Sequence, residues 1–319
     1  MLFIGYIDLH AHILPGLDDG AQTVEESVEM AKKFVDCGYG SVVATPHVID
    51  GAPSREVILE RCRALRQVLA DEGVRLQIYP GAEICLDYEF MNQLQKGDFL
   101  GLGGDESLYL LLELEAMQPL PVNLESIFFE LNARGYRVVI SHPERVVAFQ
   151  ENLEVLYRLV HKGALCQVTL GSLTGLFGPG VEETAKSILE HKMAHFLVTD
   201  AHGDGQRLAA ISEAVEIVWE KWDINMEFQL LVKNPGCVLD GKVVDADDPI
   251  FPDLKEEGRR RKRLKNNNKL NGKKRPPGKD NGANAQTKDQ RVNKARSKNG
   301  GGAEKAASQK KFRRRPQNI

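Results

Sequence analysis

Nine residues that commonly bind metal ions occur at seven places along the chain, each at or just past the end of a predicted β-strand. They are His10, His12, Asp19, His47, Glu83, Glu113, His142, Asp200 and His202. A set of imidazoles and carboxylates without a thiolate suits Mn, Fe, Zn or Mg. Because such residues recur after nearly every predicted strand, we expect their side chains to meet in one metal site, which is typical of a metallohydrolase.

The first block, DLHAHILPGLDDGA, carries two of these histidines and a pair of carboxylates. His10 and His12 are two residues apart, so in a strand their imidazoles point to the same side and could bind one ion. Asp8 could orient one of these rings from behind. Asp18 and Asp19 follow in a glycine-containing turn that could bring a carboxylate back toward the histidines. The alternative is a turn with solvated acids.

The middle blocks each place one ligand at a strand end. ATPHVIDG contributes His47 and PGAEI contributes Glu83. Taken alone, His47 is more typical of a structural or exposed histidine, and a glutamate at the position of Glu83 usually faces solvent. In LYLLLELEAM an acid interrupts an apolar strand, where an unpartnered charge is costly. Either Glu113 or Glu115 therefore needs a partner, which is a metal cation or the basic member of a buried salt bridge.

The block VVISHPERV joins a candidate ligand to a candidate phosphate contact. His142 ends a strand, and Pro143 disfavours a helix at that point. Arg145 follows, and its planar guanidinium can bind two phosphate oxygens at once. The alternative is a surface arginine paired with Glu144.

Two later blocks complete the set. In QVTLGSLTGLFG the glycines allow the chain to pass close to a ligand, unless the segment is a loop without a role. Hydrogen-bond donors in this block are Gln167, Thr169 and Ser172. In LVTDAHGDGQR, Asp200 and His202 share one face and repeat the spacing of the opening histidines. Arg207 either assists the site or caps a helix.

Short apolar runs alternate with amphipathic ones, which predicts parallel strands connected by helices. The predicted strands are Phe3–Leu9, Ser41–Thr45, Arg75–Pro80, Leu108–Leu114, Arg137–Ser141, Ala164–Thr169 and His195–Thr199. The predicted helices are Val24–Val35, 54–72, 122–134, 151–162, 181–192 and 206–222. Thr23 is the expected N-cap of the first helix, with Glu26 completing a capping box. The ligand positions favour a barrel over a doubly wound sheet, because barrels collect function at the carboxyl ends of their strands.

Charge divides the chain at about residue 254. Residues 1–254 carry 19 Lys+Arg against 40 Asp+Glu, whereas residues 255–319 carry 23 against 5. We expect an acidic folded domain at 1–254 and a disordered basic tail at 255–319, because the tail has almost no large apolar residues. An odd number of cysteines indicates a reducing compartment, and no signal peptide or membrane span is expected, so a cytoplasmic protein is predicted.

Taken together, the quoted blocks resemble the PHP (polymerase and histidinol phosphatase) superfamily. They are most similar to the bacterial metal-dependent tyrosine-protein phosphatases of capsule and exopolysaccharide loci, the CpsB/YwqE type. DLHAHILPGLDDGA, ATPH, GAEI, the strand glutamate, HPER, GSLTGLFG and DAH occur in that family's order, over roughly residues 4–245. TDAH replaces a commoner SDAH, the GDGQR loop differs from the usual one, and the tail is longer than expected. The loop difference leaves Arg207 in doubt.

The resemblance implies an α/β fold, a distorted (β/α)7 TIM-like barrel, with two or three metal ions. Manganese is the expected metal, with Fe, Zn, Mg or Co as alternatives, and all nine residues named above are the implied ligands. The residues expected to be catalytic are Arg145, His47 and Asp200. Those expected to bind substrate are Arg145, which engages phosphate in the family, Ser172 and Arg207. Water activated between cations ~3.5–4 Å apart would attack the phosphorus of phosphotyrosine.

The implied substrate is a phosphotyrosine protein, namely a bacterial tyrosine kinase that controls capsule or exopolysaccharide synthesis. Alternatives are a small-molecule PHP phosphatase acting on a compound such as histidinol phosphate, a PHP nuclease, and a non-catalytic scaffold. The acidic domain argues against a nucleic-acid groove around the site. A cysteine-dependent mechanism is excluded, since none of the five cysteines has the arginine six residues later that it needs. The composition of the tail slightly favours a solvated extension without a role over one that binds a polyanion or docks a kinase partner. A homo-oligomer is an option.

Overall fold

The computed structural model describes most of the chain up to residue 253. The described residues are 5–50, 52–87, 90, 99–104, 106–116, 119–203, 205–253 and 258. All of them belong to one unit, Met1–Lys269. Except for Gly258, the predicted disordered tail lies outside the described residues, so the expected boundary at residue 254 stays a prediction. No helix in the described part of the chain has the length and apolar character that a membrane span requires.

The strands form a ring of parallel neighbours, and three of them are interrupted. The strands are β1 (Tyr6–His12), β2 (Tyr39–Ala44), β3 (His47–Val48), β4 (Gln77–Pro80), β5 (Glu83–Cys85), β6 (Tyr109–Glu113), β7 (Arg137–Ile140), β8 (Leu165–Thr169), β9 (Phe196–Val198) and β10 (Ala201–His202). They pair in the orders β10-β1-β2-β4 and β3-β5-β6-β7-β8-β9. Because β2 continues into β3, β4 into β5 and β9 into β10, the two sheets join into a ring. The predicted (β/α)7 barrel is confirmed.

All seven predicted strands are present, with small shifts at their ends. The first extends to His12 instead of ending at Leu9. The short strands β3, β5 and β10 are not predicted, and each carries an expected ligand, namely His47, Glu83 or His202. These ligands therefore sit on hydrogen-bonded strand segments beyond a break, which holds them more rigidly than a loop would.

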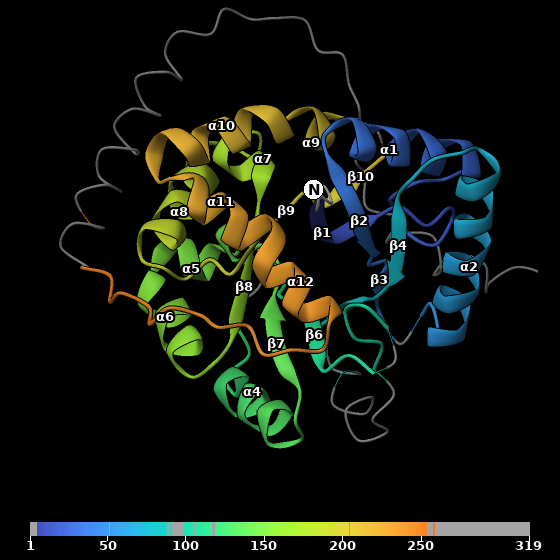
Figure 1. Ribbon diagram of the computed structural model, residues 1–319. Helices are drawn as coiled ribbons and strands as arrows, with labels where there is room; N and C mark the ends of the chain where they lie inside the picture. Colours follow the sequence, from blue (N-terminus) through green and yellow to red (C-terminus); the bar gives the residue numbers. More distant parts are fainter. Residues whose placement is uncertain are drawn as a thin grey trace, which may run out of the picture. The chain divides into compact units, whose positions relative to one another are not determined.

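Helices connect the strands and lie around them (Figure 1). The predicted helices correspond to α1 (Val24–Asp36), α2 (Arg55–Asp71), α4 (Leu124–Ala133), α6 (Leu153–His161), α8 (Pro179–Glu190) and the pair α9 (Gln206–Ala209) and α10 (Ile211–Lys221). Helical segments that are not predicted are η1 (Pro143–Arg145), α5 (Val147–Glu151), α7 (Leu170–Leu173), α11 (Ile224–Phe228), η2 (Gln229–Lys233) and α12 (Asn234–Leu239). Thr23 caps α1 as expected, but Glu26 accepts from the N–H of Gln22, so the capping box is incomplete.

An apolar plug closes the amino-terminal end of the barrel. Tyr109, Leu165 and Phe196 are the first residues of β6, β8 and β9, and they pack with Val238 of α12 and with Val244. The hydroxyl of Tyr109 donates to the carbonyl of Lys242 at 2.7 Å and accepts from the N–H of Val244 at 3.0 Å. Figure 1 shows α12 lying across the strands. This end is sealed, so function is left to the carboxyl ends of the strands.

Candidate metal centre

A β-bulge in β1 turns both opening histidines into the barrel mouth. Leu9 packs in the same apolar cluster as the plug residues, whereas Ala11 packs in the cluster formed by the strands and the surrounding helices. The register of β1 against β2 shifts between Asp8 and Ala11, which is how a bulge redirects side chains. The Nε2 atoms of His10 and His12 consequently lie 3.1 Å apart, in the common orientation that their spacing predicts.

Four of the nine residues surround one point at the mouth. Oε2 of Glu83 lies 3.1 Å from Nε2 of His10 and 3.4 Å from Nε2 of His12. Oδ1 of Asp200 lies 3.3 Å and 3.4 Å from the same two nitrogens. Two imidazole nitrogens and two carboxylate oxygens at such separations can bind a single cation.

A second group shares Glu83 with the first. Oε1 of Glu83 lies 3.1 Å from Nε2 of His142, and Oε2 lies 3.1 Å from Nδ1 of His47. Glu113 completes this group, 3.4 Å from His47 and 3.8 Å from His142. Glu83 is fully buried, and neither of its oxygens accepts a hydrogen bond from any residue that the structure describes. A buried carboxylate left in this state among four imidazoles would fit a ligand of a cation.

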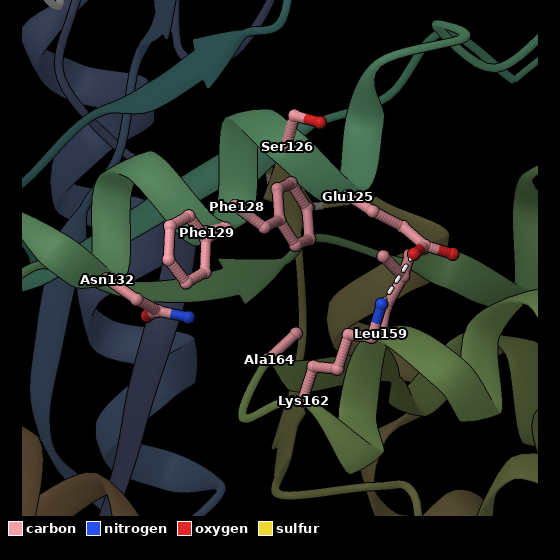
Figure 2. A pocket seen from close by; sticks show the side chains of 8 residues that line it. All are labelled: Glu125, Ser126, Phe128, Phe129, Asn132, Leu159, Lys162 and Ala164. Carbon is pink, nitrogen blue, oxygen red and sulfur yellow. Dashed lines mark hydrogen bonds and ion pairs between the residues drawn. The ribbon is translucent and has the colours of Figure 1, made fainter.

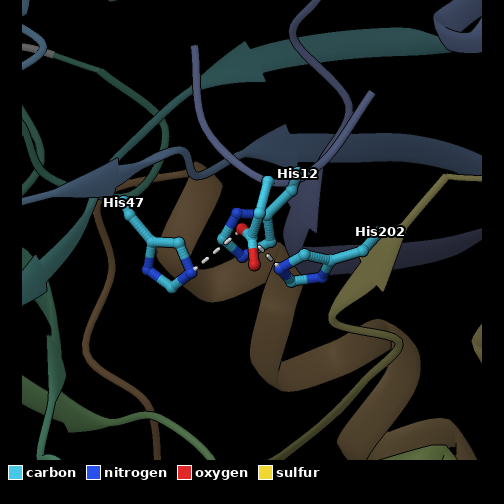
Figure 3. Close-up of side chains that lie close together, drawn as sticks. His12, His47 and His202 are labelled. Carbon is cyan, nitrogen blue, oxygen red and sulfur yellow. Dashed lines mark ion pairs between the residues drawn. The ribbon is translucent and has the colours of Figure 1, made fainter. Parts of the chain in front are cut away.

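A third group lies closer to solvent. Oδ1 of Asp19 is 3.2 Å from Nε2 of His202 and 3.5 Å from Nε2 of His47. Figure 3 shows His12, His47 and His202 pointing toward one another, and the rings of His12 and His202 stack at 3.9 Å. Nε2 of His47 faces this third group, and Nδ1 of the same ring faces Glu83 and Glu113. The structure thus brings all nine expected residues together, although their roles as ligands stay predictions.

Two side chains behind the ligands select the nitrogen that faces the centre. Nδ1 of His12 lies 2.7 Å from Oδ2 of Asp18, and Nδ1 of His10 lies 3.0 Å from Oε1 of Gln167. Each contact places the ring proton on Nδ1 and leaves Nε2 free to bind a cation. The sequence suggests Asp8 for this task, and that suggestion is wrong, because Asp8 accepts hydrogen bonds from the backbone N–H groups of His10 and Thr199 and from the Thr199 hydroxyl.

Asp8 instead holds the break between β9 and β10. It accepts from the backbone N–H of Thr199 at 3.1 Å and from the Thr199 hydroxyl at 2.5 Å. The next residue, Asp200, has a φ of +50°, and His142 has a φ of +30°. Left-handed conformations at residues other than glycine cost about 1–3 kcal/mol each and concentrate at functional sites. These contacts therefore fix the backbone that aims the Asp200 carboxylate.

Two arginines meet at the outer oxygen of Asp200. Nη1 of Arg145 lies 2.7 Å from Oδ2 of Asp200, and Nη1 of Arg207 lies 2.9 Å from the same oxygen. Nη2 of Arg145 also donates to the hydroxyl of Thr169 at 3.0 Å. Arg207 contacts the carbonyl of Asp200 and Nδ1 of His202. Arg207 therefore belongs to the site, and the alternative of a helix cap is not what the structure shows.

The pairing of Arg145 with Glu144, left open by the sequence, is wrong. Glu144 is fully buried, and its Oε1 accepts from the N–H of Thr169 at 2.9 Å and from the hydroxyl of Ser172 at 2.7 Å. Glu144 thus fastens the segment that contacts Arg145. Ser172 is itself fully buried, with its hydroxyl donated to Glu144, so its expected contact with substrate stays a prediction.

Protons and cations compete for this site. Burial lowers the pKa of His12, but the nearby carboxylates of Asp18, Asp200 and Glu83 raise it more, to well above its ordinary value. Burial also opposes the charged form of His47, yet Glu113 and Glu83 raise its pKa to about 10. Conversely, burial raises the pKa of Glu83, and the neighbouring histidines hold it well below its usual range. The carboxylates therefore stabilise positive charge at the centre, whether it is carried by protons or by metal ions.

A separate cavity of about 520 Å³ lies between α4 and α6. Figure 2 shows its lining, which includes Phe128, Phe129 and an ion pair between Glu125 and Lys162 at 2.5 Å. None of the expected site residues lines it. The cavity is mainly apolar and has no cluster of ligands, so we assign the chemistry to the barrel mouth.

Comparison with known proteins identifies relatives of this chain. A family model described as capsular polysaccharide synthesis, CpsB/CapC, matches residues 6–240. The tyrosine-protein phosphatase YwqE of Bacillus subtilis is 34% identical over 245 residues, which are 76% of this chain and 95% of that protein. The tyrosine-protein phosphatase CpsB of Streptococcus pneumoniae is 26% identical over 73% of this chain and 98% of that protein. A solved structure from work on these two proteins, described as metal-dependent tyrosine phosphatases, superposes with a TM-score of 0.72 at 32% identity, covering 77% of this chain and 99% of that one.

Proposed function

We propose that this chain, which belongs to the CpsB/CapC capsular polysaccharide synthesis family, is a metal-dependent phosphatase that hydrolyses phosphotyrosine in proteins. The expected enzyme class, a phosphoric monoester hydrolase, is confirmed by relatives named as tyrosine-protein phosphatases. We infer manganese as the metal and two or three ions as the content. The proposed substrate is a bacterial tyrosine kinase that controls capsule or exopolysaccharide synthesis.

One observation supports the proposal most strongly. The Glu83 carboxylate is fully buried, has no hydrogen bond among the described residues, and lies 3.1 Å from ring nitrogens of His10, His47 and His142. In a site that binds no cation, a buried carboxylate would be expected to accept hydrogen bonds from neighbouring donors. The donor set of imidazoles and carboxylates fits Mn, Fe, Zn or Mg.

Bound cations would lower the pKa of a coordinated water and offset the charge of the phosphate. The residues of the chain make this possible by positioning. Asp18 and Gln167 hold the protons of His12 and His10 on Nδ1, so that both Nε2 atoms face the centre. Asp8 fixes the left-handed backbone that presents Asp200. The apolar plug at the other end of the barrel restricts the entry of water to the mouth.

The two arginines supply the phosphate contacts in this proposal. Both guanidinium groups lie at the outer oxygen of Asp200, next to the ligand groups. In-plane N–H groups of arginine suit the paired oxygens of a phosphate, and they stabilise the charge that develops on those oxygens during in-line displacement. Tyrosyl oxygen is a fairly good leaving group, so a dedicated general acid is not required.

The proposal is tested by hydrolysis of a phosphotyrosine peptide and of histidinol phosphate by the same preparation. The protein is stripped with a chelator and then supplied separately with Mn, Fe, Zn and Mg. We expect the peptide to be hydrolysed only after readdition of metal, with the highest rate in Mn. Faster hydrolysis of histidinol phosphate would favour the small-molecule phosphatase, and full activity after thorough chelation would refute the proposal.

A further inference from the structure

An aromatic ring stacks on the arginine pair at the mouth of the metal centre. Phe177 lies between α7 and α8, and its ring centroid is 4.0 Å from Cζ of Arg145 and 5.5 Å from Cζ of Arg207. Both distances are within the range of cation–π attraction. We propose that Phe177 is a positioning residue that holds the two guanidinium groups in the orientation needed to bind a phosphate. This inference rests on the proposed function.

The arginine pair needs such a partner because its two charges crowd a single carboxylate oxygen. Nη1 of Arg145 and Nη1 of Arg207 lie 2.7 Å and 2.9 Å from Oδ2 of Asp200. The negative face of an aromatic ring attracts both cations and offsets part of their repulsion.

Stacking also leaves the hydrogen-bonding edges of the arginine available. A guanidinium donates only in its own plane, so an aromatic ring stacked on its face does not compete with its hydrogen bonds. Arg145 forms an ion pair with Asp200 and donates a hydrogen bond to Thr169, and its Nε is buried without a hydrogen-bond partner among the described residues. When phosphate oxygens compete with Asp200 for these donors, the contact with Phe177 can persist. The arginine can therefore exchange one acceptor for another without leaving its place.

The chain around Phe177 is built to seat the ring. A Cβ at Gly171 would lie 2.9 Å from Cδ2 of Leu176 and 3.4 Å from Cε2 of Phe177, so a larger residue there would displace the leucine side chain beside the ring. The N–H of Leu176 donates to the carbonyl of Gly171 at 3.1 Å, which closes the turn. Gly175 and Gly178 flank the ring with φ of +78° and +94°, which favour glycine. The ring position is thus set by the backbone and not by chance packing of an exposed side chain.

The test compares Phe177→Ala, Phe177→Leu and Phe177→Tyr in the metal-loaded full chain. For Phe177→Ala, we expect KM for para-nitrophenyl phosphate and Ki for inorganic phosphate to rise together, about three- to tenfold, with a smaller change in kcat. Phe177→Leu keeps an apolar side chain but has no π-face, so it should behave like Phe177→Ala. Phe177→Tyr keeps the aromatic face, so its KM and Ki should equal those of the wild-type protein. Metal content should be unchanged in all three variants.

The matched control is Phe129→Ala, which removes an exposed phenyl ring on α4, outside the site. It should leave both constants unchanged. Unchanged KM and Ki in Phe177→Ala, or wild-type behaviour of Phe177→Leu, would overturn the inference. Calorimetric binding of inorganic phosphate to the metal-loaded protein does not require turnover. It therefore tests Phe177 even if the wild-type protein fails to hydrolyse phosphotyrosine, an outcome that would remove only the proposed function.

Discussion

Replacing Asp18 with asparagine should weaken cation binding while leaving all nine metal-facing side chains in place. Oδ2 of Asp18 accepts from Nδ1 of His12 at 2.7 Å and from the N–H of His47 at 3.0 Å. Oδ1 accepts from the N–H of Gly20 at 2.9 Å. Asparagine has the same shape but only one accepting oxygen, so its NH₂ group must face at least one of these donors. The contact with that donor becomes repulsive, and the hydrogen bond that orients the His12 ring loses its charged acceptor in either orientation of the amide.

The magnitude follows from the hydrogen bonds that change. Burial raises the pKa of Asp18, but the hydrogen bond from His12 and its attraction lower it below the ordinary value, so the carboxylate is ionised at neutral pH. A hydrogen bond to a charged group contributes about 1.5–3 kcal/mol, and about 1.4 kcal/mol is a tenfold change in a binding constant. Loss of a partner that orients a metal-binding histidine weakens affinity about 10- to 100-fold. We therefore expect the Kd for Mn²⁺ to rise by about one to two orders of magnitude.

The assay is calorimetric titration of chelator-treated protein with Mn²⁺, supported by competition with a coloured chelator. Asp36→Asn is the matched control, because it makes the same charge change at the exposed end of α1. It should leave the Kd unchanged. If Asp18→Asn binds Mn²⁺ within twofold of the wild-type protein, the orienting role of Asp18 is wrong.

The structure also predicts the results of three other measurements. Arg145→Lys should lower kcat/KM for para-nitrophenyl phosphate about 10- to 100-fold, because an ammonium cannot keep the contacts to both Asp200 and Thr169; an unchanged value would contradict this role. The pKa of His47 is raised to about 10 without metal, so its protonated ring stabilises the folded state. This stabilisation is complete below the ordinary pKa of histidine and is lost as pH rises through about 10. Mn²⁺ binding at about pH 7 must therefore release protons, which calorimetry in two buffers of different ionisation enthalpy detects, and binding without proton release would contradict the competition. Burial lowers the pKa of His195 to about 4. Its neutral ring therefore contributes to folding stability above the ordinary pKa of histidine, and this contribution is lost as pH falls through about 4. Between about pH 7 and 5, urea unfolding of the chelated wild-type protein should show a loss about 2 kcal/mol larger than that of His195→Asn, and parallel profiles would refute this.

Periodicity and composition predicted the strands, because residues buried on both faces of a parallel sheet are almost continuously apolar. The same reasoning placed ligands together, since the carboxyl ends of parallel strands meet at one rim. His10 and His12 illustrate this success, because their spacing alone gave their common orientation. The bulge that turns them inward left no sequence signal, since it depends on the register of β1 against β2.

Partners behind the ligands were harder to predict. Asp8 and Asp18 are both close in sequence to the histidines, and only the path of the turn decides that Asp18 reaches the ring of His12. A Cβ at Gly20 would lie 2.2 Å from the carbonyl oxygen of His12, so this glycine permits that path. Phe177 was missed because an aromatic residue in a glycine-rich segment indicates packing as readily as function. Its contact with Arg145 joins two segments distant in sequence, which no local pattern records.

Metal content and hydrolysis measured on one preparation test the central claim most directly. The protein is reconstituted with Mn²⁺, freed of unbound metal and divided between elemental analysis and a phosphotyrosine-peptide assay, before and after chelation. We expect two or three ions per chain in the active sample and a parallel loss of ions and activity on chelation. Full hydrolysis by a sample with far less than one ion per chain would contradict the account.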